Sequence, residues 1–277
     1  MKQQIGFTKA TGLGNDFIII DDRMGGIKFD PGKLAVALCD RHFGIGADGL
    51  LILKKSGRAD FLMEYYNADG SHGGMCGNGG RSLAMYAHTR GVAGGSMTFE
   101  ALDHLYHADV TRTGVRLRMK TPADLRAESS IQVAGVSIDG FFVDTGSPHF
   151  VIFCNDLNAV DVEMLGRLLR HHEAFQPQGT NVDFVKVLGQ KEIAVRTYER
   201  GVEAETLACG TGSVAAAFVS HLHRGVQPPV TVGVRSGDAL VVELDKTHEI
   251  WLEGGVRILF DGECLYDLSS HEISTAH

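Results

Sequence analysis

Two short segments of the chain each carry a cysteine followed by a glycine-rich turn. They are Cys76-Gly77-Asn78-Gly79 and Cys209-Gly210-Thr211-Gly212, and the two cysteines lie 209 − 76 = 133 residues apart in a chain of 277. Two thiols presented by equivalent turns of two equivalent halves can face each other across a cleft. One thiol can then take a proton from one side of a carbon atom while the other returns a proton to the opposite side. The pair therefore predicts an epimerase that works without a cofactor.

Each of these cysteines is followed by two glycines and then by an apolar stretch that is typical of a helix. Glycine lets the backbone turn sharply and come close to a ligand. The start of a helix leaves N–H groups unpaired and carries partial positive charge, so it suits an anion such as an α-carboxylate. The same field favours a thiolate and lowers the pKa of a cysteine from its usual ~8.5. Two buried structural cysteines are the alternative, and the repetition of the turn favours the catalytic interpretation.

The other three cysteines, Cys39, Cys154 and Cys264, have no such surroundings. Cys39 falls in an expected helix and Cys154 ends an apolar stretch, where cysteine commonly fills space in a core. We expect all three to be inert. Five cysteines, an odd number without framework spacing, are typical of a reduced, cytoplasmic protein.

The repeat extends beyond the two cysteine turns. At the same shift of 133 residues, Asp16-Phe17-Ile18-Ile19 aligns with His149-Phe150-Val151-Ile152, and Asp48 aligns with Asn181. A shift of 132 aligns Asn67 with Glu199. Matches in the same order at nearly one offset predict the internal duplication of a whole domain, because solenoid units are only about 20–50 residues long. The expected halves are residues 1–120 together with about 256–277, and residues 121–255.

Each expected half consists of strands interrupted by helices. The helices are expected at residues 31–39, 79–88, 161–171 and 213–223. Long runs of β-branched residues with one or two helices per half predict an α/β (α+β) fold, in which each half is a curved, barrel-like sheet around a central helix. The strand segments at 257–260 and 265–268 are expected to cross back to the first half. The polar tail after Ser269 is expected to be loose.

Composition excludes several classes of function. The net charge of 26 − 34 = −8 provides no basic field for a nucleic-acid backbone. The first residues lack the apolar stretch of a signal peptide, and no apolar run approaches the ~20 residues that span a bilayer. An apolar share of 44% is ordinary for a globular protein with sizeable cores. We therefore expect a cytoplasmic protein with a small-molecule substrate, and no nucleic-acid or membrane partner.

Two patterns that could suggest a cofactor or a metal fail on their context. The segment from Gly44 to Gly49 matches G-x-G-x-x-G, but an expected helix precedes it and a strand follows, the reverse of a dinucleotide site. The run His171-His172-Glu173 cannot direct three adjacent side chains to one face of a helix. No phosphate-binding loop or zinc spacing occurs. We expect neither a metal nor a cofactor.

Polar residues gather at the turns that the repeat places near the two cysteines. Asn67 and Glu199 hold equivalent positions nine or ten residues before them. His149 and Glu199 are the side chains best suited to share a proton with a thiol. The full set of polar candidates is Asn15, Asn67, Asn78, Asn181, Glu199 and Arg200.

These residues form motifs over almost the whole chain that resemble those of the diaminopimelate epimerase family. The motifs are Gly14 to Phe17, Arg41 to Gly49, Asn67 to Ser71, Met75 to Gly79, Ser147 to His149, Thr180 to Val182, Tyr198 to Gly201 and Glu205 to Gly212. The resemblance implies two pseudo-symmetric halves with the active site in the cleft between them. It also implies conversion of LL-2,6-diaminopimelate to the meso form, in lysine and cell-wall precursor synthesis, and a homodimer is retained as an expectation.

The resemblance also implies roles for single residues. Cys76 and Cys209 would be the acid and base pair, with His149 and Glu199 tuning them. The residues that would hold the non-reacting end of the substrate are Asn15, Asn67, Asn181, Glu199 and Arg200. The residues that would supply amides around the reacting carboxylate are Gly77, Asn78, Gly210 and Thr211.

The chain departs from the family pattern in two places. Ser147 stands where Asn usually precedes Pro-His, and it offers only one hydroxyl to the substrate. The loop from Gly201 to Glu205 is one residue longer than in many members. Three alternatives stay open at this point: a racemase of the same fold for another amino acid, a binding module without catalysis, and a thiol redox protein. Neither repeated cysteine lies in a C-x-x-C pair, which argues against redox chemistry.

Overall fold

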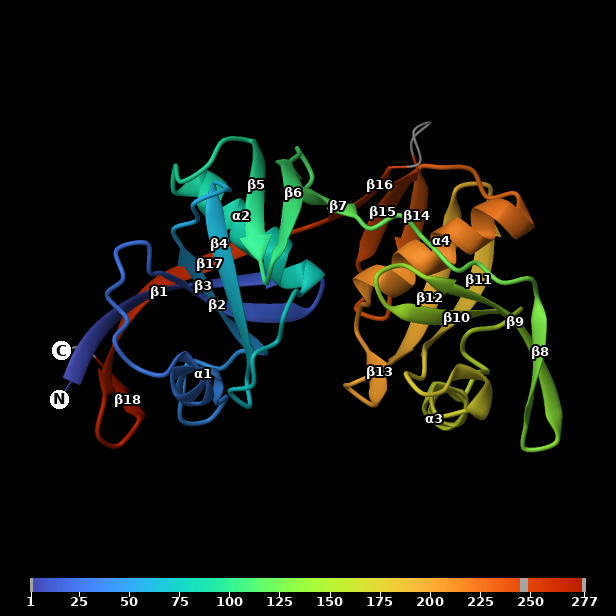
Figure 1. Ribbon diagram of the computed structural model, residues 1–277, viewed down its shortest axis with the longest axis horizontal. Helices are drawn as coiled ribbons and strands as arrows, with labels where there is room; N and C mark the ends of the chain where they lie inside the picture. The colour runs from blue at the N-terminus through green and yellow to red at the C-terminus, as the bar shows by residue number, and fades with distance from the viewer. Residues whose placement is uncertain (1, 245–248, 276–277) are drawn as a thin grey trace. The chain divides into compact units, whose positions relative to one another are not determined.

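The computed structural model describes residues 2–244 and 249–275 (Figure 1). The chain divides into two compact units. Unit 1 comprises Met1–Leu117 and Gly254–His277, and unit 2 comprises Arg118–Glu253. Each unit mixes strands and helices, which agrees with the α/β class expected from the sequence.

Unit 1 is built on a sheet in which the last long strand returns to the first one. The paired order is β18-β17-β1-β2-β3-β4-β5-β6-β7, and the β2/β3 and β4/β5 pairs are parallel. The strands are β1 (Lys2–Gly12), β2 (Asn15–Asp21), β3 (Gly49–Lys54), β4 (Phe61–Asn67), β5 (Ser96–Ala101), β6 (His104–Val110), β7 (Val115–Met119), β17 (Arg257–Asp267) and β18 (Glu272–Thr275).

Unit 2 repeats this pattern of parallel and antiparallel pairs. Its paired order is β8-β9-β10-β11-β12-β14-β15, the β10/β11 and β12/β14 pairs are parallel, and β13 pairs with the opposite end of β12. The strands are β8 (Ser129–Val133), β9 (Val136–Asp144), β10 (Pro148–Phe153), β11 (Asn181–Gly189), β12 (Glu192–Glu199), β13 (Ala204–Thr206), β14 (Val230–Gly233), β15 (Ala239–Leu244) and β16 (Ile250–Gly254).

The strand registers of the two units are superimposable by a constant shift. In unit 1 Leu50 pairs with Ile18 and Tyr66, and in unit 2 Val182 pairs with Phe150 and Tyr198. The shift is 182 − 50 = 132, one less than the 133 that separates the cysteines. His149 is therefore equivalent to Phe17, and the alignment of His149 with Asp16 is wrong by one residue. The common register supports an internal duplication, which stays a prediction together with its exact bounds.

Two pairs of helices cover the sheets (Figure 1). The helices α1 (Pro31–Cys39) and α3 (Val162–Arg170) each pack on one face, against β3/β4 and β11/β12. The helices α2 (Gly77–Thr89) and α4 (Gly210–Arg224) are each surrounded by several strands of their own unit. A short 3₁₀ helix, Glu173–Phe175, follows α3. Each unit thus encloses one central helix, as expected.

The alternation of side chains along β3 explains why helices lie on both of its faces. Leu50 and Ile52 join the core cluster that contains Leu34 and Leu38 of α1. Leu51 points the other way, toward the first turn of α2, and all three strand residues are fully buried. A strand buried on both faces consists of a continuous apolar run, and Gly-Leu-Leu-Ile-Leu is such a run.

The central helices begin earlier than the sequence predicted. They start at Gly77 and Gly210, directly after the cysteines, and not near residues 79 and 213. Glycine weakens a helix only moderately when packing compensates, so the glycine-rich turns are themselves the first helical turns. Cys76 and Cys209 are consequently the N-caps of α2 and α4.

The end of the chain also differs from the expectation. The tail after Ser269 is not loose, because β18 pairs with β17 and Ile273 packs on the core cluster of unit 1. The expected return of the last long strand is confirmed, since β17 pairs with β1. Within the described residues, the helices are all too short or too polar to span a membrane.

Candidate active site

The first part of the candidate site is the start of α2 in unit 1. Cys76 has extended backbone angles, φ −110° and ψ 120°, and its Sγ accepts a hydrogen bond from the N–H of Gly79 at 3.4 Å. The side chain is half-buried. A Cβ on Gly79 would lie 3.1 Å from Cδ2 of Leu51, so a side chain there would crowd the strand beneath. The helix start is therefore packed closely against β3 and presents the thiol at its end.

A chain of amide side chains runs from this helix start. The Nδ2 of Asn78 donates to Oδ1 of Asn15 at 2.5 Å, and the Nδ2 of Asn15 donates to Oδ2 of Asp48 at 3.0 Å. Asn78 is buried, and its amide is thereby held in one orientation. Two of the predicted substrate-binding residues, Asn15 and Asn78, are thus brought into direct contact.

The chain of amides ends in a group of charged side chains. Arg41 donates to Oδ1 of Asp16 and to Oδ1 of Asp48, both at 2.7 Å, and Lys9 donates to Oδ2 of Asp16 at 2.7 Å. Burial alone would raise the pKa of Asp16, but the hydrogen bonds from Arg41 and Lys9 outweigh it and lower the pKa to about 2. The carboxylates that anchor Asn15 are therefore ionised throughout the neutral range.

Arg81 lies beneath the same helix start, and the sequence did not single it out. The side chain is completely buried, and its Nη2 donates to Oδ1 of Asn78. Its Nε and Nη1 have no hydrogen-bond partner. Burial lowers the pKa of Arg81 to about 10, and the charge of Cys76 acts in the opposite direction. Arg81 therefore stays a cation at neutral pH, next to the thiol.

Asn67 ends β4 and has a different neighbourhood. Its Nδ2 donates to Oγ of Ser71 at 2.9 Å, and its backbone N–H donates to the Ser71 carbonyl at 2.9 Å. Among the described residues, the side chain thus bonds within its own turn, without reaching Asn15 or Asn78. The structure places Asn67 at the expected end of the strand, and its role toward a substrate stays a prediction.

The second part of the candidate site is the start of α4 in unit 2. Cys209 caps this helix with φ −114° and ψ 117°, nearly the angles of Cys76, and is buried. A Cβ on Gly212 would lie 2.4 Å from Oδ1 of Asp183, a separation that real Cβ atoms do not adopt. Glycine is required at this position because a buried carboxylate lies directly below the first turn.

That carboxylate orients His149. Its Oδ2 lies 2.7 Å from Nδ1 of His149, and both side chains are completely buried. Thr197 donates its hydroxyl to Oδ1 of Asp183 at 2.7 Å. An ionised Asp183 holds a proton on Nδ1 of His149, which leaves Nε2 to accept or donate on the other side of the ring. Asp183 was not predicted, and it decides the tautomer of a residue that was.

Thr211 connects His149 to Cys209. Its Oγ1 lies 2.9 Å from Nε2 of His149 and 3.5 Å from Sγ of Cys209. A hydroxyl both donates and accepts, so this link is consistent with a thiol beside a neutral imidazole or with a thiolate beside an imidazolium. The arrangement provides a path for a proton between the thiol and the histidine.

Cys209 differs from the expectation for a thiol at a helix start. Its pKa is raised well above the ordinary value, first by burial and then by the negative charges of Glu199 and Asp183. The hydroxyl of Thr211 acts in the opposite direction but does not reverse the shift. The expected lowering of the pKa by the helix field is therefore wrong for Cys209, because desolvation and two carboxylates outweigh that field.

Glu199 ends β12 near the same thiol. Its Oε2 accepts a hydrogen bond from the hydroxyl of Thr206 at 3.0 Å. Burial raises its pKa, while Thr206 and the charge of His149 act to lower it. A carboxyl group with a raised pKa can hold or release a proton nearer to neutral pH than an exposed one.

Three predicted substrate-binding residues meet at one end of β11. The Nδ2 of Asn181 donates to Oγ of Ser147 at 3.0 Å, and its Oδ1 accepts from the backbone N–H of Arg200 at 2.8 Å. The guanidinium of Arg200 donates to Oγ of Ser147 at 3.3 Å and to the Gln178 carbonyl at 3.2 Å. Ser147, the departure from the family pattern, is thus bound by both neighbours.

The remaining cysteines are poor candidates for chemistry. Burial raises the pKa of Cys39 to about 12 and also raises those of Cys154 and Cys264. A raised pKa suppresses the nucleophilic thiolate. Among the described residues, no group of three His, Cys, Asp or Glu side chains is placed to hold a metal.

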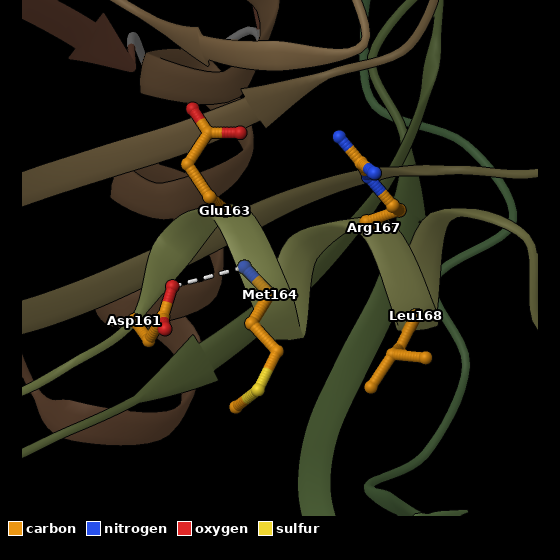
Figure 2. Close-up of a pocket in the computed structure, with 5 residues that line it drawn as sticks. All are labelled: Asp161, Glu163, Met164, Arg167 and Leu168. Atoms are coloured by element: carbon orange, nitrogen blue, oxygen red, sulfur yellow. Dashed lines mark hydrogen bonds between the residues drawn. The ribbon is translucent and has the colours of Figure 1, made fainter.

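Figure 2 shows a hollow on α3 that contains none of the predicted residues. It has a volume of about 420 Å³. Its lining side chains are Asp161, Glu163, Met164, Arg167 and Leu168. Asp161 is occupied as the N-cap of the helix, where it accepts from the N–H of Met164 at 3.0 Å. The hollow lies on an outer helix, away from the two cysteine turns along the chain.

Comparison with known proteins bears directly on these two turns. A family model described as diaminopimelate epimerase matches two stretches of the chain, residues 7–123 and 141–259. The chain belongs to the diaminopimelate epimerase family. The diaminopimelate epimerase of Aquifex aeolicus is 42% identical over 268 residues, which cover 92% of this chain and 96% of the relative. That of Chlorobaculum tepidum is 44% identical over 257 residues, which cover 91% and 98%.

Membership in this family confirms the resemblance that the motifs indicated and the class of enzyme, an isomerase. Solved structures share the fold at low identity. A PhzF-family phenazine biosynthesis protein from Bacillus anthracis has a TM-score of 0.71 at 14% identity, covering 94% of this chain and 99% of that one. A probable proline racemase from Agrobacterium radiobacter has a TM-score of 0.69 at 15% identity, covering 93% and 92%. These likenesses confirm the fold class.

Proposed function

We propose that this protein converts LL-2,6-diaminopimelate to the meso form by a two-thiol mechanism without a cofactor. The observation that carries the proposal is the matched pair of cysteines, each capping a central helix with nearly the same backbone angles. Membership in the diaminopimelate epimerase family supports the choice of substrate.

The proposed reaction balances one proton on each side of the α-carbon. The thiolate of one cysteine removes the α-proton and becomes a thiol. The thiol of the other cysteine gives its proton to the opposite face and becomes a thiolate. Backbone N–H groups at the two helix starts would bind the α-carboxylate and stabilise the charge that develops on the substrate. These groups belong to Gly77, Asn78, Gly210 and Thr211.

Two side chains would adjust the protonation of Cys209. Asp183 orients His149, and Thr211 links His149 to the thiol. Glu199 adds a buried carboxyl group whose pKa is raised. A proton could therefore leave Cys209 along the Thr211–His149 path when the thiol has to act as a base.

The distal amino acid centre of the substrate would be held by polar side chains from both units. Arg200 offers a planar, permanently charged guanidinium for a second carboxylate. Its contacts with Ser147 and the Gln178 carbonyl are long enough to be exchanged for a stronger ionic one. The other residues proposed for this end are Asn15, Asn67, Asn181, Glu199 and Ser147.

The wider setting follows from the same proposal. The product is a precursor for lysine and for the peptidoglycan cell wall, so we propose a place in those biosynthetic routes and in the cytoplasm. We also propose that the protein forms a homodimer, which the sedimentation of purified protein would test directly.

Proton NMR in D₂O provides the test of the reaction. The purified protein is mixed with LL-diaminopimelate, and the α-proton signal is followed over time. We expect the signal to disappear while the meso isomer accumulates, because the returning proton comes from solvent-exchanged thiols. Parallel samples with proline and histidine should keep their α-protons. A faster exchange with either of these would instead identify a racemase for another amino acid.

A further inference from the structure

Arg81 has a position that its contacts do not explain. In a helix the Cα–Cβ bond points toward the N-terminus, so the side chain of Arg81 extends back beneath the first turn of α2. A Cβ on Gly77 would lie 3.9 Å from Nη1 of Arg81. The guanidinium therefore lies directly under the residues that follow Cys76.

The hydrogen bonds of Arg81 are incomplete. The side chain is fully buried, yet only Nη2 has a partner, Oδ1 of Asn78, while Nε and Nη1 have none. Burying a charged group with unpaired donors is strongly unfavourable unless an anion compensates it. Among the described residues, the charge that acts on Arg81 is that of Cys76.

Stability of the helix start does not require this arginine. The equivalent position in α4 is 81 + 133 = 214, which is a valine. Val214 is fully buried, and α4 begins with the same glycine turn and the same cap angles. A hydrogen bond to Asn78 would likewise need only one of the donors of the guanidinium. The two free donors therefore point to a function that α4 lacks.

We propose that Arg81 is a positioning residue that stabilises the thiolate of Cys76 from beneath the helix and keeps this thiol ionised before substrate binds. The other titratable group close to Cys76 is Tyr65 on β4, which burial and the charge of Cys76 keep neutral by raising its pKa. The nearest carboxylates of the same network, Asp16 and Asp48, are paired with Arg41. Arg81 is thus the buried cation of this helix start that no carboxylate neutralises.

Alkylation of Cys76 tests the proposal without any substrate. The protein is treated briefly with iodoacetamide between pH 5 and pH 10, and the labelled Cys76 peptide is quantified by mass spectrometry. In Arg81→Met we expect the midpoint of labelling to rise by ~1–2 pH units, because an opposite charge close to an ionised group shifts its titration by about that amount. Arg81→Lys should restore part of the shift, since it keeps the charge but not the fork of donors.

Two controls separate this effect from a loss of structure. Arg90→Met removes an arginine from the C-terminal end of the same helix, where it pairs with Asp261, and should leave the midpoint unchanged. The labelling of Cys209 in unit 2 should not change in Arg81→Met. In the kinetic assay, Arg81→Met should lower kcat by ~10-fold or more while KM changes much less, because the substrate contacts remain.

An unchanged Cys76 midpoint in a folded Arg81→Met protein would overturn the proposal. If that variant does not fold, the wild-type midpoint decides, since a value at or above that of a free thiol, ~8.5, would equally overturn it. The inference rests on the proposed function only for its kinetic part. A shifted midpoint in a protein that exchanges no α-proton would retain Arg81 and reject the epimerase reaction.

Discussion

The two helix starts share a backbone and differ in the charge buried beneath them. Below Gly79 of α2 lies Leu51, and below the equivalent Gly212 of α4 lies Asp183. The strand registers place these two residues at equivalent positions, 183 − 51 = 132. The helices show the opposite exchange, because buried Arg81 in α2 corresponds to Val214 in α4. One cysteine therefore lies over a cation and the other over an anion.

This difference bears on how a two-thiol enzyme can begin its reaction. One thiol has to start as a base and the other as an acid, and two identical surroundings would not distinguish them. Negative charge near Cys209 raises its pKa and favours the protonated form. Positive charge near Cys76 favours the thiolate. The buried charges would thus assign opposite starting states to two residues that the repeat makes equivalent.

The largest effect is expected from removing either thiol. Cys76→Ala and Cys209→Ala should each abolish epimerisation, with losses of at least ~1,000-fold, because a single base cannot invert a centre. The measurement is the rate of conversion of LL- to meso-diaminopimelate. Cys39→Ala is the matched control and should retain nearly full activity, since Cys39 is buried in the core. A single mutant with near wild-type turnover would exclude the two-thiol mechanism.

The next largest effect concerns the distal carboxylate of the substrate. Arg200→Met should lower kcat/KM for diaminopimelate by about 30-fold to a few thousand-fold, because an unpaired buried carboxylate costs ~2–5 kcal/mol. Arg167→Met provides the control, since Arg167 lies on the outer helix α3 (Figure 2). If Arg200→Met loses nothing on diaminopimelate, the assignment of the substrate fails even when both thiols are essential.

Replacing Asp183 tests the anionic side of the comparison. Asp183→Asn removes one of the negative charges that raise the pKa of Cys209, so the midpoint of Cys209 labelling should fall by ~1 pH unit. Activity should fall on the order of 100-fold, because the orientation and tautomer of His149 are no longer fixed. Asp238→Asn, at an exposed turn, is the control. A fall at Cys76 rather than Cys209 would show that the two environments are wrongly assigned.

A smaller effect is expected from Thr211, which links His149 to the thiol. Thr211→Val keeps the shape but removes the hydroxyl, and should slow turnover by ~10-fold, the equivalent of one hydrogen bond of about 1 kcal/mol or slightly more. Thr211→Ser keeps the hydroxyl and should stay within ~2-fold of the wild type. Equal rates for the two variants would mean that the proton does not pass through this side chain.

The sequence predicted the two thiols because the chemistry of each is contained in one local motif. It also predicted His149, Asn181 and Arg200, and the structure brings the last two together with Ser147. The helix starts were placed two or three residues too late, since glycine propensity argues against helix and only packing on β3 and β11 overrides it. The error of one residue in the repeat arose because the shift differs between strands and cysteines.

The buried charges could not be found in the same way. Arg81 stands among small and apolar residues of a helix, and Asp183 within a strand of apolar residues. A charged residue inside an apolar run was the available signal, because such residues are almost never buried without a partner. Which partner it meets depends on strands and helices that are far apart along the chain, so the role appears only after folding.

The last prediction concerns how firmly the Cys76 side is held. Lys9 and Arg41 lower the pKa of Asp16 from 3.8 to about 2 against the effect of burial, which corresponds to at most ~2.4 kcal/mol. Partial exposure of the group reduces this to about 1–2 kcal/mol. A lowered carboxyl pKa stabilises the protein above pH 3.8, and this contribution is lost as the pH falls toward 2. Asp16→Asn should therefore reduce the free energy of unfolding by about 1–2 kcal/mol at pH 7 and by progressively less below pH 4.

Urea denaturation followed by circular dichroism at pH 7, 5, 4 and 3 measures this difference. Asp103→Asn, at an exposed turn of unit 1, is the control and should show no such trend. The His149–Asp183 pair of unit 2 has no exposed cation in contact, so Asp16→Asn should also leave the labelling midpoint of Cys209 unchanged. A stability difference that stays constant from pH 7 to pH 3 would mean that Asp16 acts by its shape. The ionic anchoring of Asn15 and Asn78 would then be no part of the contrast between the two thiols.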